Sequence, residues 1–220
     1  MTRGLRFVVA ATIAASLVAL SAPPAASGQG FAINVTRISP ELKERMKGKS
    51  WHRGCPVPIR DLRLIRVSYH GFDREPHMGK LVVNEDAVRV MSEALRVMWD
   101  RSFKIRRMRL VDVYDGSDDR SMSADNTSAF NCRRVAGTDR WSEHAYGRAI
   151  DINPVENPYV SSDGSVSPPE GRDYADRSQH RRGMIRAGSQ IVKAFTSRGW
   201  GWGGNWDSPK DYQHFSASGN

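Results

Sequence analysis

The chain of 220 residues lacks a hydrophobic run long enough to cross a bilayer comfortably. The apolar stretch from Phe7 to Leu20 falls short of the roughly 20 residues that a transmembrane helix needs. Basic residues precede this stretch and small residues follow it, which is the three-part pattern of a secretory signal peptide. We therefore expect residues 1–27 to be a signal peptide that is cleaved near Gly28, and a retained membrane anchor is the alternative.

Cysteine is scarce, since Cys55 and Cys132 are the only two in the sequence. In an exported chain, two cysteines favour a single disulfide, and two unpaired buried thiols are the alternative. A disulfide would tie the N-terminal region to the segment before residue 142 and would stabilise the fold by about 2 to 4 kcal/mol.

Acidic residues are fewer than basic ones, at 24 against 33, so the formal net charge is +9. A basic exported protein is attracted to polyanions such as anionic cell-wall polymers, although solvation alone could explain much of the excess. No basic helix and no strand with interleaved aromatic residues stands out, so we do not expect nucleic acid as a partner.

The apolar pattern mixes two periods, and no internal repeat is visible. Alternation predicts strands, and three-to-four spacing with capping residues predicts helices. A long segment rich in Pro, Ser, Gly and charge, 157–182, predicts a surface loop that could act as a lid. We expect an α+β chain with a lead-in and short helix over 28–53 and one domain over 54–220. The expected strands are 65–69, 80–83, 109–114, 149–152 and 214–216, and the expected helices are 40–48, 85–101 and 184–198.

Two histidines and one aspartate stand out as metal-ligand candidates: His144, Asp151 and His214. Two imidazoles and a carboxylate make a zinc ligand set of the catalytic kind, which leaves a fourth tetrahedral position for water. In the strand over 149–152, the neighbours of Asp151 would face the core and its carboxylate the other side. Asp211 lies three residues before His214 and could serve as a general base and then as a proton donor. This pattern is typical of a hydrolase.

The flanking residues carry a family resemblance. The motif Ser142-x-His144-x-x-Gly147-x-Ala149-x-Asp151, with Trp202-Gly203-Gly204-Asn205-Trp206 and Asp211-x-x-His214-Phe215 downstream, resembles the M15 family of zinc peptidases. The resemblance is to its D-alanyl-D-alanine carboxypeptidase-like branch, and 126–133 looks like the strand before the metal motif. It implies a small antiparallel sheet flanked by helices, as in these peptidases and the hedgehog domain.

The same resemblance implies roles for individual residues. His144, Asp151 and His214 would bind zinc, and Asp211 would be the catalytic acid and base. Arg133 looks like the family arginine that steadies the substrate carboxylate or the oxyanion, a role that its planar donor fork suits. Ser142 could hydrogen-bond near the substrate or only cap a turn.

Three tryptophans near the C-terminus allow two interpretations. Trp200, Trp202 and Trp206 could form an aromatic wall for a glycan or peptide, or could pack in the core. Trp206 is the better candidate for a wall because it is closest to Asp211 in the sequence.

The expected function follows from export, charge and the motif together. We expect a secreted or wall-associated monomer that cleaves peptidoglycan stem peptides, first as a D-alanyl-D-alanine carboxypeptidase. An L-alanyl-D-glutamate endopeptidase is the second choice within the family. A zinc-stabilised wall-binding module without turnover is the rival from another class.

Overall fold

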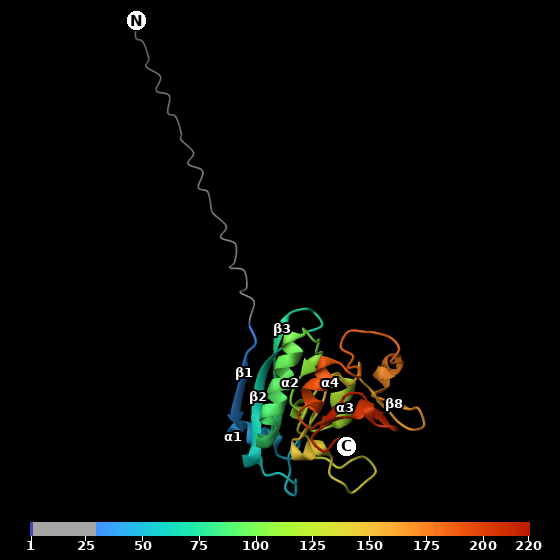
Figure 1. Ribbon diagram of the computed structural model, residues 1–220. Helices are drawn as coiled ribbons and strands as arrows, with labels where there is room; N and C mark the ends of the chain where they lie inside the picture. Colours follow the sequence, from blue (N-terminus) through green and yellow to red (C-terminus); the bar gives the residue numbers. More distant parts are fainter. Residues whose placement is uncertain (2–29) are drawn as a thin grey trace.

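The computed structural model describes Met1 and residues 30–220, so the expected signal peptide over 1–27 lies almost wholly outside the described residues. In the described part, short helices alternate with small sheets, as expected for an α+β chain (Figure 1). No described helix has the length and apolar character that a bilayer span requires.

The first sheet is antiparallel and has the order β1-β2-β3. One of its faces packs on the main core, where Figure 1 shows α2 lying along the sheet with α4 beside it. Its other face is partly covered by α1, through a smaller core that contains Leu42, Met46, Leu64 and Val82. The elements are β1 (Ile33–Arg37), β2 (Leu62–His70), β3 (Pro76–Asn84), α1 (Pro40–Met46), α2 (Val88–Asp100) and α4 (Gln190–Thr196).

Two further antiparallel sheets of three strands each carry the C-terminal half. One has the order β6-β11-β9 and the other the order β10-β7-β8. A parallel pair, β4 and β5, and one more short helix, α3, complete the regular structure. The strands are β4 (Arg107–Met108), β5 (Asn126–Thr127), β6 (Ala149–Asp151), β7 (Tyr159–Val160), β8 (Val166–Ser167), β9 (Gly201–Trp202), β10 (Lys210–Asp211) and β11 (His214–Ser216), and α3 spans Asp118–Ser123.

Short 3-10 helices join several of these elements. The first helical turn after β3 is such a helix, η2, which runs directly into α2. The others are η1 (Ile59–Asp61), η3 (Val111–Tyr114), η4 (Glu143–Tyr146), η5 (Pro169–Tyr174) and η6 (Gly203–Asn205), and η2 spans Glu85–Ala87.

The strand predicted over 109–114 is wrong, because residues 111–114 form η3. In a strand Val111 and Val113 would face the same side, but Val111 is buried and Val113 is 55% exposed. Asp112 between them is buried and accepts a hydrogen bond from Ser50 Oγ at 2.8 Å. In the segment predicted as a strand over 126–133, Asn126–Thr127 form β5, and Ser128 makes an isolated antiparallel bridge to Asp151.

The helix predicted over 184–198 is shorter than expected and spans only α4. Gly188 has a left-handed backbone (φ 71°), which interrupts the helix, and Ser189 begins it by accepting a hydrogen bond from Val192 N.

The surface loop predicted over 157–182 contains β7, β8 and η5. Its two ends are joined by Arg177, whose guanidinium donates to the main-chain oxygens of Glu156 and Ile185 and to Asn157 Oδ1. Because β7 also pairs with β10, this segment is fastened to the strand that carries Asp211.

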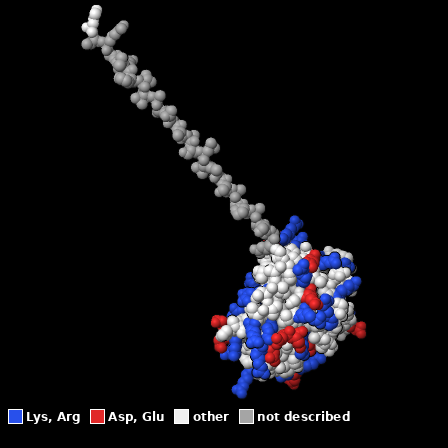
Figure 2. Space-filling model, turned by 60° about the vertical axis from the view of Figure 1, so that its left-hand side comes forward, with Lys and Arg blue, Asp and Glu red and all other residues white. Residues whose placement is uncertain are grey.

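The two cysteines are joined in a disulfide that links residues 77 positions apart. Charged side chains lie mixed on the surface: Figure 2 shows Lys and Arg spread over one face with Asp and Glu among them.

Candidate metal and catalytic site

The three candidate ligands come from two neighbouring strands and one turn. His214 on β11 is the register partner of Asp151 on β6, so both side chains lie on one face of that sheet. On β6, Ile150 and the following Ile152 are fully buried, while the Asp151 carboxylate faces a cavity, as the alternation predicts.

His144 is held in a single turn, η4, that is fixed at both ends. Ser142 caps the turn by accepting a hydrogen bond from His144 N at 3.3 Å. Gly147 ends it with φ 68°, and a Cβ there would lie 2.5 Å from Asn84 N, so glycine is required. The capping role of Ser142 is therefore observed, and Ser142 also lines the cavity.

The ligand atoms of these residues converge. Asp151 Oδ2 lies 3.0 Å from His144 Nε2, and Asp151 Oδ1 lies 3.0 Å from His214 Nδ1. The two ring nitrogens are 3.2 Å apart. Four tetrahedral ligands at about 2 Å from zinc are separated by about 3.3 Å, so this spacing suits one zinc ion.

The outer ring nitrogens determine which tautomers are present. His144 Nδ1 donates to the main-chain oxygen of Ala129, and His214 Nε2 donates to that of Asn220 at 3.1 Å. In neutral imidazoles the facing nitrogens, His144 Nε2 and His214 Nδ1, are then both without a proton, and their lone pairs, 3.2 Å apart, repel each other. Only a cation or a proton between them relieves that repulsion, so the site fits a metal ion.

Electrostatics agree with a site for positive charge. The neighbouring His144 and His214 hold the pKa of Asp151 far below its usual range, although burial alone would raise it. Burial alone would lower the pKa of His214, but the hydrogen bond and charge of Asp151 raise it to about 9. The buried carboxylate of Asp151 thus favours positive charge at this place, as a metal site requires.

Asp211 lies beside this triad. Burial raises its pKa to about 7, against the positive charges of His214, His144 and Arg133. Its Oδ1 is buried and has no hydrogen-bond partner in the described part of the chain. A carboxyl group of this kind can accept and return a proton near neutral pH.

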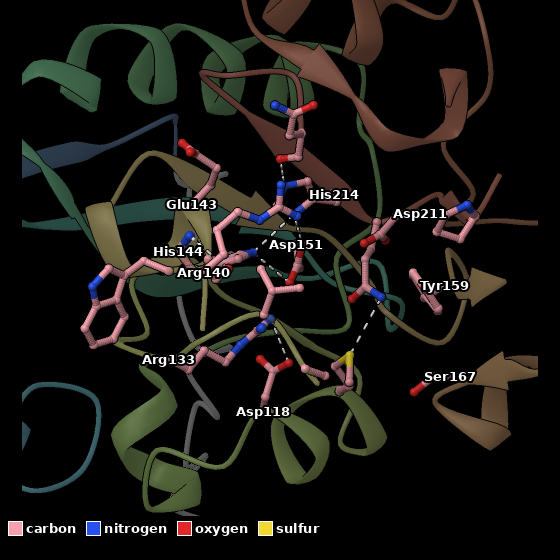
Figure 3. A pocket seen from close by; sticks show the side chains of 18 of the residues that line it. Asp118, Arg133, Arg140, Glu143, His144, Asp151, Tyr159, Ser167, Asp211 and His214 are labelled. Atoms are coloured by element: carbon pink, nitrogen blue, oxygen red, sulfur yellow. Dashed lines mark hydrogen bonds and ion pairs between the residues drawn. The ribbon is translucent and has the colours of Figure 1, made fainter. Parts of the chain in front are cut away.

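A cavity of about 780 Å³ opens over these residues (Figure 3). Arg133 enters it from one side, where its Nη2 lies 2.8 Å from Asp118 Oδ2. Its Nε is buried and has no hydrogen-bond partner among the described residues. The ion pair with Asp118 was not foreseen from the sequence.

Of the three tryptophans near the C-terminus, two pack in the core and one lines the cavity. Trp200 and Trp202 are buried in the core, at 7% and 3% exposure. Trp206 lines the cavity, with its ring centre 5.8 Å from that of His214. Other lining residues were also missed in the sequence, among them Arg140, Tyr159, Ser167 and Gln213.

A second group with possible ligand atoms, His52 with Cys55 and Cys132, lies elsewhere. Both of its sulfur atoms are bonded to each other in the disulfide, so they are not free to bind a metal.

Comparison with known proteins supports the resemblance drawn from the motif. A family described as D-alanyl-D-alanine carboxypeptidase matches residues 136–217, which include all three candidate ligands and Asp211. Comparisons with curated proteins and with solved structures give no match. The match over residues 136–217 therefore supports an M15 family peptidase.

Proposed function

We propose that the protein is a zinc metallopeptidase that cleaves the stem peptides of peptidoglycan, with D-alanyl-D-alanine carboxypeptidase activity as the first choice. The observation that carries this proposal is the convergence of His144, Asp151 and His214 beside the unpaired, buried carboxyl oxygen of Asp211. We further propose a hedgehog and D-alanyl-D-alanine peptidase-like domain over 54–220, exported by the signal peptide 1–27. The basic surface suits a protein at the cell wall, where anionic polymers are present, and the disulfide suits an exported protein. We propose that the protein acts there as a monomer.

His144 Nε2, His214 Nδ1 and the Asp151 carboxylate would hold the zinc. Zinc there would polarise the scissile carbonyl and make an attacking water more acidic. Asp211 accepts a proton from the attacking water at its carboxylate and returns it to the leaving amine. Arg133 Nε, buried and unpaired, donates to a substrate oxygen. Trp206 and Ser142 line the cavity and limit the space around the substrate.

The test is product release from purified peptidoglycan and from a D-Ala-D-Ala-terminated peptide, with fragments identified by mass spectrometry. Chelation and Asp211→Ala should each abolish release, while the Asp211→Ala variant should still bind zinc. Release that survives both treatments would refute the mechanism. If the wild type cuts no stem peptide, the wall-binding module is the better interpretation.

The cleaved bond decides between the two peptidase activities. Loss of a single terminal D-alanine supports the carboxypeptidase. A cut between L-alanine and D-glutamate supports the endopeptidase, which needs a groove open at both ends.

A further inference from the structure

Three side chains in the cavity form one row across a small sheet. Asp211 on β10 is the register partner of Tyr159 on β7, and Tyr159 is the register partner of Ser167 on β8. Register partners in antiparallel strands project from the same face, and all three residues line the cavity. Figure 3 shows them along one side of the cavity, with Arg133 and Asp118 on another.

The proposed role of Asp211 fixes which part of the substrate lies along this row. The group that protonates the leaving amine must lie next to that amine. Neighbouring strands are about 4.8 Å apart, so the row extends about 10 Å from Asp211 to Ser167. One peptide residue spans at most about 3.6 Å, so the carboxyl end of the leaving residue falls beside Tyr159 and towards Ser167.

The two hydroxyl groups are available for such a ligand. Both residues are half-buried, and neither hydroxyl has a hydrogen-bond partner among residues 30–220. The negative charge of Asp211 contributes to raising the pKa of Tyr159, after burial, so the phenol is close to Asp211 and stays a proton donor. A phenol and a serine hydroxyl can each donate a hydrogen bond to a carboxylate or a carbonyl oxygen.

From this geometry we infer that Tyr159 and Ser167 form the subsite for the leaving residue and bind its terminal carboxyl oxygens. This inference rests on the proposed peptidase function and adds the side of the cavity on which the leaving residue lies. It also assigns the two sides of the scissile bond to different residues. Tyr159 and Ser167 bind the leaving residue, and Arg133, which is paired with Asp118 elsewhere in the cavity, contacts the substrate on the other side of that bond.

The test compares Tyr159→Phe, Ser167→Ala and the double variant on two peptides that end in D-Ala-D-Ala, one with a free carboxylate and one amidated. A hydrogen bond to a charged group is worth about 10- to 100-fold, and one to a neutral group about 2- to 10-fold. We expect each single variant to lose at least about tenfold in kcat/KM on the free acid and less on the amide. Tyr174→Phe is the matched control, because Tyr174 lies in the same segment, in η5, outside the cavity lining.

Binding is measured separately from turnover, by calorimetry of the free-acid peptide in an Asp211→Asn background. Weaker binding in the Tyr159 and Ser167 variants, with Tyr174→Phe unchanged, supports the subsite. Equal losses on the free acid and the amide, or unchanged binding, overturn the subsite even where hydrolysis occurs. If the wild type binds the peptide through these hydroxyls and cleaves nothing, the proposed function fails and the subsite stands. If the wild type binds no peptide, both are wrong.

Discussion

Gly203 packs directly against Asp211. A Cβ added at Gly203 would lie 2.6 Å from the main-chain oxygen of Asp211 and 2.8 Å from its Cβ. These distances are shorter than any real contact, so a side chain at Gly203 must displace the strand that carries the proposed general base. Gly203, the first residue of η6, therefore fixes the depth at which the carboxyl group of Asp211 enters the cavity.

We expect Gly203→Ala to lower kcat about 10- to 100-fold, because small displacements of a catalytic group are costly. Zinc content should stay unchanged, since no ligand is moved directly. Gly30→Ala is the control, because a Cβ there meets no atom within 4 Å. Steady-state kinetics with metal analysis checks this, and an unchanged kcat would show that Asp211 does not need its present position.

Substitution of a proposed zinc ligand and substitution of the proposed base, Asp211, should have different effects on zinc content. Asp151→Asn removes the only anionic ligand and should lose most of the bound zinc together with activity. Asp211→Asn should keep zinc and lose about 10²- to 10⁴-fold in kcat, the usual contribution of a general acid or base. Zinc stoichiometry of the purified proteins is the measurement, and zinc loss in Asp211→Asn would make Asp211 a ligand.

Asp118 should act on the substrate through Arg133. Asp118→Asn leaves the guanidinium of Arg133 without its charged partner, and we expect kcat/KM to fall several-fold. Arg133→Ala should be more severe, and adding Asp118→Asn to it should change little, because the two residues share one interaction. A double-mutant cycle measures this, and independent, additive losses would contradict the coupling.

Glu156 should make stability depend on pH. Burial and the neighbouring Asp125 raise its pKa to about 8, although Arg106 lowers it. The unfolded carboxyl group titrates near 4.5 and the folded one near 8, so the folded state retains a proton that the unfolded state loses. The stabilising contribution is therefore complete below about pH 4.5 and is lost as the pH rises to about 8.

Glu156→Gln keeps the neutral, proton-donating form at every pH. Its melting temperature should match that of the wild type near pH 5 and exceed it near pH 8. Thermal unfolding across this range is the measurement, with Glu170→Gln, an exposed change in the same segment, as the control. If the melting temperatures of the wild type and the variant differ by the same amount at both pH values, Glu156 is not the group whose titration changes the stability.

The disulfide should contribute to stability and not to the chemistry. Replacing Cys55 and Cys132 with serine opens a loop of 77 residues and should cost about 2 to 4 kcal/mol, or about 5 to 15 °C in melting temperature. Below the new melting temperature kcat should be close to that of the wild type. A large loss of kcat in folded protein would indicate that the disulfide positions the adjacent Arg133.

The grouping of His144, Asp151 and His214 could be predicted because it is encoded in two short local motifs. Ser142 to Asp151 forms one turn and the strand after it, and Asp211 to His214 forms the other half of the site. The main helix was predicted nearly whole, and the strands over 65–69 and 80–83 were predicted as parts of the longer β2 and β3. Their long hydrophobic pattern determines both element type and buried face.

The row of Tyr159 and Ser167 could not be predicted, because their strands are two residues long. Two residues contain no alternation, and the register with β10 depends on pairing across about fifty residues. The error at 109–114 has a related cause. There the valines alternate correctly for a strand, but the buried Asp112 and its bond to Ser50 favour a helical turn.

The turn between β7 and β8 has a practical use. It is exposed at Asp163 and Gly164, and its shape is held by Asp163, which accepts hydrogen bonds from Ser165 N at 2.9 Å and from the Ser161 hydroxyl. Because the hairpin carries Tyr159 at its base, a fluorophore attached through Ser162→Cys, an exposed position of the same turn, would sit outside the cavity on the hairpin that forms part of its wall. Such a label could report ligand occupancy optically while leaving the reacting groups untouched.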